Sequence, residues 1–238
     1  MSGRLYALGT GPGASDLITV RAARIIGKLD VLYAPAGRKG GDSLALSIVR
    51  EYLSDSTELR TCHFPMSADN DEKAVVWDET AAALKHEVEQ GKQVGFITLG
   101  DSMLFSTWVF LLARIGNPEW LEIVPGVTSF AAIASCAQLP LAMEAQSLAV
   151  MSCTASHQEL SQALRAHDCV VLMKVYGRFA QIKALLQHLG IIQHAVLMAE
   201  ATLPNEQCFR NLEAVPDDQQ LPYFSTILVN KQWSMSVG

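Results

Sequence analysis

Short apolar runs with the period of strands alternate along this 238-residue chain with amphipathic runs that have the period of helices. In the first half, the predicted strands are residues 4–8, 30–34, 58–63, 93–98 and 119–124. The helices predicted between them are residues 15–28, 43–53, 72–90 and 103–115. Asp16 and Ser43 are the expected N-caps of the first two helices. The alternation predicts an α/β fold in which helices cover both faces of a mainly parallel sheet.

The segment Pro125-Gly126-Val127-Thr128 interrupts this pattern, and a helix of small residues is expected over 130–137. In the second half, the predicted strands are residues 147–152, 169–174, 195–199, 207–212 and 223–229, with helices at 157–166 and 178–189. Because the late strands follow one another without helices, the second sheet should be mixed or antiparallel. We therefore expect two α/β domains, residues 1–118 and 119–238.

Composition narrows the class of protein. Half of the residues are hydrophobic, as in a globular chain, and the net charge of −6 argues against a nucleic-acid binder. The sequence contains no uncharged apolar run of about 18 residues, so no membrane span is expected. With no signal-peptide pattern at the start, we expect a cytoplasmic protein. Cys62-His63 is the only adjacent pair of soft ligands, so we expect no metal site.

A glycine-proline loop, Gly9-Thr10-Gly11-Pro12-Gly13, follows the first predicted strand. Gly9, Gly11 and Ala14 fit the dinucleotide-binding fingerprint. That fingerprint also expects an acid at the end of the second strand, whereas Asp30 precedes it, and Pro12 removes one backbone donor from the turn. Taken alone, the loop is compatible with a nucleotide-like ligand and with a structural turn.

Two further loops follow predicted strands in the same way. Leu99-Gly100-Asp101-Ser102 comes after the strand at 93–98, and Pro125-Gly126-Val127-Thr128-Ser129 comes after the strand at 119–124. In a parallel sheet, the loops that follow the strands share one edge, and ligands bind there. The three loops therefore predict a ligand site at that edge.

In combination, these loops resemble those of the tetrapyrrole (corrin/porphyrin) methylase family, whose members use S-adenosylmethionine. The blocks that carry the resemblance are residues 9–13, 98–102, 124–129 and 172–178. Their spacing extends the resemblance over the whole chain. Within the family, the likeness is greatest to the methylases of carbon 20 of precorrin-2, or of its cobalt form, in cobalamin synthesis. It rests on the stretches 33–35, 40–43, 63–66 and 105–107.

The resemblance implies a class III methyltransferase-like protein, with its cofactor in a cleft between two domains, and a homodimer. The residues implied in cofactor binding are Leu99, Gly100, Asp101, Leu104, Thr128, Ser129, Tyr176, Gly177, Ala201 and Thr202. The first loop would face the tetrapyrrole, through Gly9, Gly11, Pro12 and Gly13.

Methyl transfer from an activated cofactor requires no nucleophilic side chain, and the sequence shows no such set. A weak base can assist the loss of a proton, and the candidates are Asp101, Tyr176 and His63. A polycarboxylate macrocycle also needs cations gathered on a protein of net charge −6. The predicted clamp consists of Arg38, Lys39, Lys174 and Arg178.

Other functions fit parts of the same sequence. A related methylase could act on a different ring carbon or on diphthine in a protein. A dinucleotide-dependent oxidoreductase would use the first loop, although Ala34 stands where its ribose-binding acid is expected. A tetrapyrrole carrier would bind the macrocycle without turnover.

Overall fold

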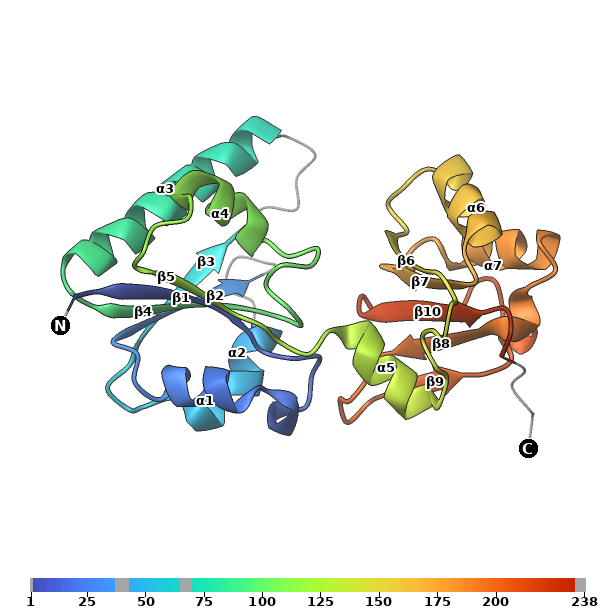
Figure 1. Cartoon of the computed structure of the whole chain (residues 1–238), viewed down its shortest axis with the longest axis horizontal. Coiled ribbons are helices and arrows are strands. Elements are labelled where there is room, and N and C mark those ends of the chain that lie inside the picture. The colour runs from blue at the N-terminus through green and yellow to red at the C-terminus, as the bar shows by residue number, and fades with distance from the viewer. Residues whose placement is uncertain (1, 37–42, 65–69, 234–238) are drawn as a thin grey trace. The chain divides into compact units, whose positions relative to one another are not determined.

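The computed structural model describes residues 2–36, 43–64 and 70–233. The chain forms two compact units, Met1–Thr128 and Ser129–Gly238. Each unit is a sheet with helices on both faces, in agreement with the predicted α/β class (Figure 1). Arg38 and Lys39, two members of the predicted clamp, lie outside the described residues.

Unit 1 contains five parallel strands in the order β3-β2-β4-β1-β5. The strands are β1 (Arg4–Gly9), β2 (Val31–Ala36), β3 (Glu58–His63), β4 (Gln93–Thr98) and β5 (Leu121–Val124). The helices are α1 (Val20–Ile26), α2 (Leu44–Val49), α3 (Asn70–Glu89) and α4 (Trp108–Ile115), with 3-10 turns at Ser15–Leu17 and Arg50–Tyr52. Figure 1 shows α1 and α2 on one face of the sheet and α3 and α4 on the other.

Strand β1, which lies between β4 and β5, is buried on both faces. Leu5 and Ala7 pack with Leu84 of α3, whereas Leu8 packs with Ala22 of α1 on the opposite face. Successive side chains of a strand point to opposite faces, so both faces require apolar residues. This explains why residues 5–8 of β1 form a continuous apolar run.

Two helices of unit 1 begin later than predicted. The Thr19 side chain accepts a hydrogen bond from Ala22 N and caps α1, whereas Asp16 lies in a separate 3-10 turn. The helix predicted at 103–115 begins only at Trp108, because residues 101–107 form a loop held by Asp101 and Ser106. The predicted cap of α2 is confirmed, since Ser43 Oγ accepts from Leu46 N.

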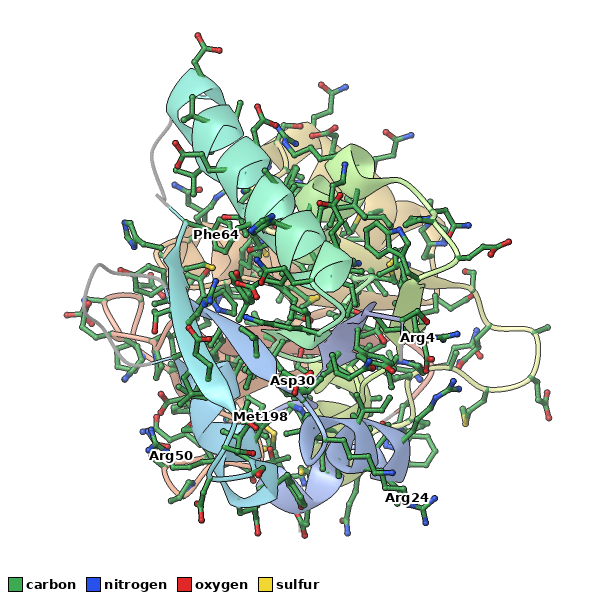
Figure 2. The ribbon with its side chains drawn as sticks, turned by 90° about the vertical axis from the view of Figure 1, so that its left-hand side faces the viewer. Arg4, Arg24, Asp30, Arg50, Phe64 and Met198 are labelled. Atoms are coloured by element: carbon green, nitrogen blue, oxygen red, sulfur yellow. The ribbon has the colours of Figure 1, made fainter. Side chains whose placement is uncertain are left out.

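Charged side chains stabilise the edge of this sheet where the strands begin. Asp30, which precedes β2, accepts a hydrogen bond from Gln93 N at 2.7 Å. Glu122 of β5 pairs with Arg21 at 2.6 Å and with Arg4 at 3.8 Å. Figure 2 looks onto this side of unit 1, with Arg4 and Asp30 at the starts of their strands. The glycine loops lie at the opposite edge, where the strands end.

Unit 2 contains a mixed sheet in the order β6-β7-β10-β8-β9, as predicted. The strands are β6 (Leu148–Ser152), β7 (Cys169–Met173), β8 (Ala195–Ala199), β9 (Gln207–Phe209) and β10 (Ser225–Asn230). The helices are α5 (Ser129–Ala137), α6 (His157–Ala166) and α7 (Phe179–His188), with 3-10 turns at Ile192–His194 and Leu212–Ala214. In the described part of unit 2, β6 and β7 are the only parallel pair, and β10 is antiparallel to both of its neighbours.

The division between the units falls after Thr128, later than the expected boundary at 118/119. The reason is β5, whose residues 121–124 pair in parallel with β1 and complete the first sheet. Residues 125–128 of the third glycine loop therefore belong to unit 1, and its last residue, Ser129, begins α5 of unit 2. Among the described residues, no helix combines the length and apolarity needed to span a membrane.

Candidate functional site

The three glycine loops meet at one edge of unit 1. They follow β1, β4 and β5, which are neighbours in the sheet and run in the same direction. Gly11 N donates to Gly100 O at 3.2 Å, and Gly100 N donates to Gly11 O at 2.7 Å. This reciprocal pair joins the first loop to the second, as the sequence predicted for a shared site.

The first and third loops touch at glycines because a side chain would not fit. A Cβ atom at Gly9 would lie 2.6 Å from Gly126 N, and one at Gly126 would lie 2.1 Å from Gly100 O. These neighbours are backbone atoms, which cannot rotate away as a side chain can. The contact therefore requires glycine and leaves bare backbone at the edge where a ligand can approach.

Asp101 links the second loop to the third. Its Oδ1 accepts from Met103 N at 2.9 Å, and its Oδ2 accepts from Gly126 N at 2.9 Å. Each carboxylate oxygen is thus engaged with a backbone donor, as is typical of a residue that holds loop geometry. The structure therefore gives this predicted site residue a clear organising role.

Two buried hydroxyls lie at the end of β4 and in the loop that follows it. Thr98 Oγ1 and Ser102 Oγ have no hydrogen-bond partner within the part of the chain that the structure describes. The neighbouring Thr10 hydroxyl, in contrast, donates to Thr98 O at 3.1 Å. Unused buried polar atoms are rare and call for water or a ligand. This edge therefore has hydrogen-bonding capacity suited to a polar ligand.

The remaining predicted residues of unit 1 flank these loops. Leu99 and Leu104 are half-buried, and Leu104 N donates to Asp101 O at 3.4 Å in the turn that carries the carboxylate. Thr128 lies in the third loop and is the last residue of unit 1. Ser129 begins α5 and belongs to unit 2.

The predicted residues of unit 2 also gather at one edge of their sheet. Tyr176 and Gly177 follow β7, and Ala201 and Thr202 follow β8. Both strands are antiparallel to β10, which lies between them, so both loops emerge at the edge where β10 begins. Tyr176 is 54% exposed, and Ala201 is buried.

Arg178 has a structural role within unit 2. Its guanidinium donates to the backbone carbonyl of Ala155 at 2.7 Å, to that of Cys153, and to Gln181 Oε1 at 3.2 Å. These contacts tie the turn after β6 to the start of α7. Most of the guanidinium donors that a substrate clamp would use are therefore directed into the protein.

Comparison with known proteins finds a family match that includes these loops. The sequence profile of the tetrapyrrole (corrin/porphyrin) methylases matches residues 4–216, which include all of the glycine loops and the segment after β7. The chain belongs to this methylase family. The resemblance noted from the sequence is thereby confirmed.

Individual members of the tetrapyrrole methylase family are similar over nearly the whole chain. The cobalt-precorrin-2 C(20)-methyltransferase of Salmonella typhimurium is 74% identical over 233 residues, covering 98% of each protein. The precorrin-2 C(20)-methyltransferase of a Sinorhizobium species is 30% identical and covers 95% of each protein. The crystal structure of a uroporphyrin-III C-methyltransferase from Thermus thermophilus, complexed with S-adenosylhomocysteine, has a TM-score of 0.67 and 24% identity, covering 95% of this chain and 97% of that one.

His63, a predicted base in this methylase, lies apart from the glycine loops. It ends β3 at the outer edge of the sheet, and β2 and β4 separate β3 from β1. Neighbouring strands are about 4.8 Å apart, so His63 is roughly 10 Å from the line of β4. Its buried Nδ1 has no partner among the described residues. The sheet order, which the sequence did not specify, accounts for this separation.

Sequence reasoning missed two aromatic residues of this methylase beside Tyr176. Tyr223 and Phe224 were assigned to a strand at 223–229, but β10 begins at Ser225. Ser225 Oγ donates to Pro222 O at 2.6 Å and closes a turn that precedes the strand. An aromatic pair directly after a proline and ahead of an apolar strand is the signal that could have identified them.

Proposed function

We propose that this chain transfers a methyl group from S-adenosylmethionine to carbon 20 of cobalt-precorrin-2 (cobalt-factor II) in cobalamin biosynthesis. The observation that carries the proposal is the 74% identity, over 98% of both chains, to the Salmonella cobalt-precorrin-2 C(20)-methyltransferase. Membership of the tetrapyrrole methylase family and the meeting of three glycine loops at one sheet edge support it. The alternatives are a methylase that acts on a different ring carbon or on diphthine, a dinucleotide enzyme and a carrier, and none has comparable support.

Each unit, taken by itself, offers residues that fit the cofactor. S-adenosylmethionine supplies a methyl group on a positively charged sulfur, which leaves as a neutral thioether. Leu99, Gly100 and Leu104 would hold it in unit 1, where backbone and the Ser102 hydroxyl offer polar contacts. Asp101 would act by fixing the second and third loops through Met103 N and Gly126 N.

In unit 2, the proposed cofactor residues are Tyr176 and Gly177 after β7 and Ala201 and Thr202 after β8, together with Ser129 at the start of α5. Aligning two bound reactants can remove about 7–11 kcal/mol from a barrier. Positioning is therefore the main task of these side chains.

Carbon 20 gains the methyl group and loses a proton, which a base or water accepts. Asp101 is already engaged at both oxygens with backbone donors, so we assign it a positioning role. Tyr176 and His63 remain candidates for the proton acceptor. The pH profiles of Tyr176→Phe and His63→Gln distinguish them, because loss of the acceptor flattens the limb that reports its ionisation.

The macrocycle carries several carboxylates, and the protein has a net charge of −6. Local cations must therefore offset the repulsion. Lys174 at the end of β7, with Arg38 and Lys39, forms the proposed clamp, whereas Arg178 is largely engaged with backbone carbonyls. Gly9, Gly11, Pro12 and Gly13 would present backbone to the ring.

The function is tested by anaerobic incubation of the protein with S-adenosylmethionine and precorrin-2, with and without inserted cobalt, followed by mass spectrometry. The expected result is one added methyl group on the cobalt form and an equal amount of S-adenosylhomocysteine. Methylation of the metal-free form alone would assign the enzyme to the cobalt-independent reaction. If neither form is methylated although the cofactor binds, the proposed acceptor is wrong.

The proposal includes a cytoplasmic homodimer. All five cysteines are free thiols, including the exposed Cys136 and Cys208, as expected in a reducing compartment. Val75, Met103 and Phe105 in unit 1 are exposed apolar side chains that a second copy would cover. Sedimentation equilibrium tests the dimer, and a monomer at micromolar concentration would contradict it.

A further inference from the structure

Three segments of unit 2 meet at the edge where β10 begins. They are residues 174–177 after β7, residues 200–202 after β8, and residues 222–224 before β10. The register pairs Thr226 with Met173 and Ser225 with Ala199, so the third segment leaves the sheet between the other two. Figure 1 shows β10 between β7 and β8. The residues just ahead of β10 therefore separate the two loops that carry the proposed cofactor residues.

Backbone hydrogen bonds hold the middle segment in place. Glu200 N donates to Phe224 O at 2.9 Å, and Val175 N donates to Ser225 O at 3.3 Å. Ser225 Oγ closes the turn by donating to Pro222 O at 2.6 Å. The side chains of this segment are thus presented from fixed backbone, as is required of a ligand-binding surface.

The middle segment extends the exposed ring of Tyr176 into an aromatic cluster. The ring centroids of Tyr176 and Tyr223 are 6.0 Å apart, with 55° between the rings, and those of Tyr223 and Phe224 are 5.1 Å apart at 85°. Tyr223 and Phe224 are 45% and 39% exposed. The Phe224 ring, nearly perpendicular to that of Tyr223, holds it edge-to-face. Adjacent exposed aromatic rings at a ligand-bearing edge offer faces for a flat ring.

We propose that Tyr223 is a further cofactor-binding residue, and that its ring packs with Tyr176 against the purine of S-adenosylmethionine. This rests on the proposed function. The purine is favoured over the macrocycle because the cluster lies between the two loops assigned to the cofactor. Tyr176 is itself 54% exposed, so its side chain is open to a ligand.

The test measures binding of S-adenosylhomocysteine and S-adenosylmethionine by titration calorimetry, and KM for the tetrapyrrole, in the full chain. Base–aromatic stacking contributes about 1–3 kcal/mol per base, so Tyr223→Leu should weaken the binding of both cofactor forms by roughly 5- to 150-fold. Tyr223→Phe keeps the ring and should bind nearly as the wild type does. Phe110→Leu removes an equally exposed ring (45%) from α4 and serves as the matched control.

The outcomes separate the possible contacts. If Tyr223→Leu lowers the affinity for both cofactor forms equally and leaves the KM for the tetrapyrrole unchanged, the result supports the purine assignment. If only the binding of S-adenosylmethionine is weakened, Tyr223 contacts the charged sulfur. If only the KM for the tetrapyrrole is raised, Tyr223 contacts the macrocycle. Either result overturns the proposal. If the wild-type protein binds the cofactor but does not methylate the tetrapyrrole, the proposed acceptor is rejected. The comparison of cofactor affinity between the wild type and the Tyr223 variants still tests the purine contact in that case. A wild type that binds no S-adenosylhomocysteine would reject both.

Discussion

Replacing Gly126 by alanine tests whether the three loops are in contact. The new Cβ atom would lie 2.1 Å from Gly100 O and 2.8 Å from Gly9 Cα. Inserting atoms into a packed interior costs about 1–3 kcal/mol. We expect the upper end, about 3 kcal/mol, because the three atoms nearest to the new Cβ atom all belong to the backbone. For a chain of this size, that corresponds to a fall in Tm of roughly 6–12 °C.

The same substitution should weaken binding of the cofactor. Gly126 N donates to Asp101 Oδ2, so displacing Gly126 also disturbs the carboxylate that joins the second and third loops. Circular dichroism gives the Tm, and titration with S-adenosylhomocysteine well below that temperature gives the affinity. Both values should fall in the alanine variant.

Gly27→Ala is the matched control. Gly27 ends α1 with a φ of −67°, and the nearest atom to its Cβ position is Tyr52 O at 3.4 Å, an ordinary contact. Alanine is tolerated in such a conformation, so the control should retain wild-type Tm and affinity. If Gly126→Ala behaves like Gly27→Ala in both measurements, the proposed close contact of the loops is wrong.

Four further results are expected. Asp101→Asn replaces one acceptor oxygen with a donor that faces a backbone N–H. The variant should lose about 1–3 kcal/mol of its free energy of unfolding and bind S-adenosylhomocysteine more weakly. A free energy of unfolding equal to that of the wild type would refute the organising role. Arg38→Ala should raise the KM for the tetrapyrrole with little change in cofactor affinity, and an unchanged KM would remove Arg38 from the clamp. Arg178→Ala should lower Tm because two backbone carbonyls lose their donor, whereas an unchanged Tm with a raised tetrapyrrole KM would return Arg178 to the clamp. Burial raises the pKa of the Cys153 thiol from 9.0 to about 11, so the free energy of unfolding should decline between these pH values as the unfolded thiol ionises first. Urea titrations across this range should show a smaller decline in Cys153→Ala, and an equal decline would contradict the assignment.

The elements that local pattern determines were predicted well. The alternation of strands and helices, the parallel first sheet and the mixed second sheet all follow from apolar periodicity and from the spacing of turns. The helix expected at 103–115 was too long because Met103 and Leu104 are apolar. The contacts that exclude them from the helix begin at Asp101, whose carboxylate also binds Gly126 N, 25 positions away. A local pattern cannot contain that information.

The arrangement of the site depended on strand order, which periodicity does not specify. The loops after β1, β4 and β5 met as expected, but the same order placed two strands, β2 and β4, between His63 on β3 and the strand β1. Likewise, Arg178 was an apparent surface cation until its carbonyl partners at Cys153 and Ala155 were known. Tyr223 became a candidate only when β10 was found between β7 and β8. In each case, pairing between distant segments decided the outcome.

The position of β10 also has a consequence for vectorial synthesis on the ribosome. Its residues, 225–230, fill the middle of the second sheet, between strands that are translated earlier. Unit 1 has all of its strands once β5 has emerged, whereas β7 and β8 must wait for their common partner with their hydrogen-bonding edges unpaired. Such edges are prone to aggregation, so the interval before β10 is translated is the one in which unit 2 is most exposed to wrong pairing.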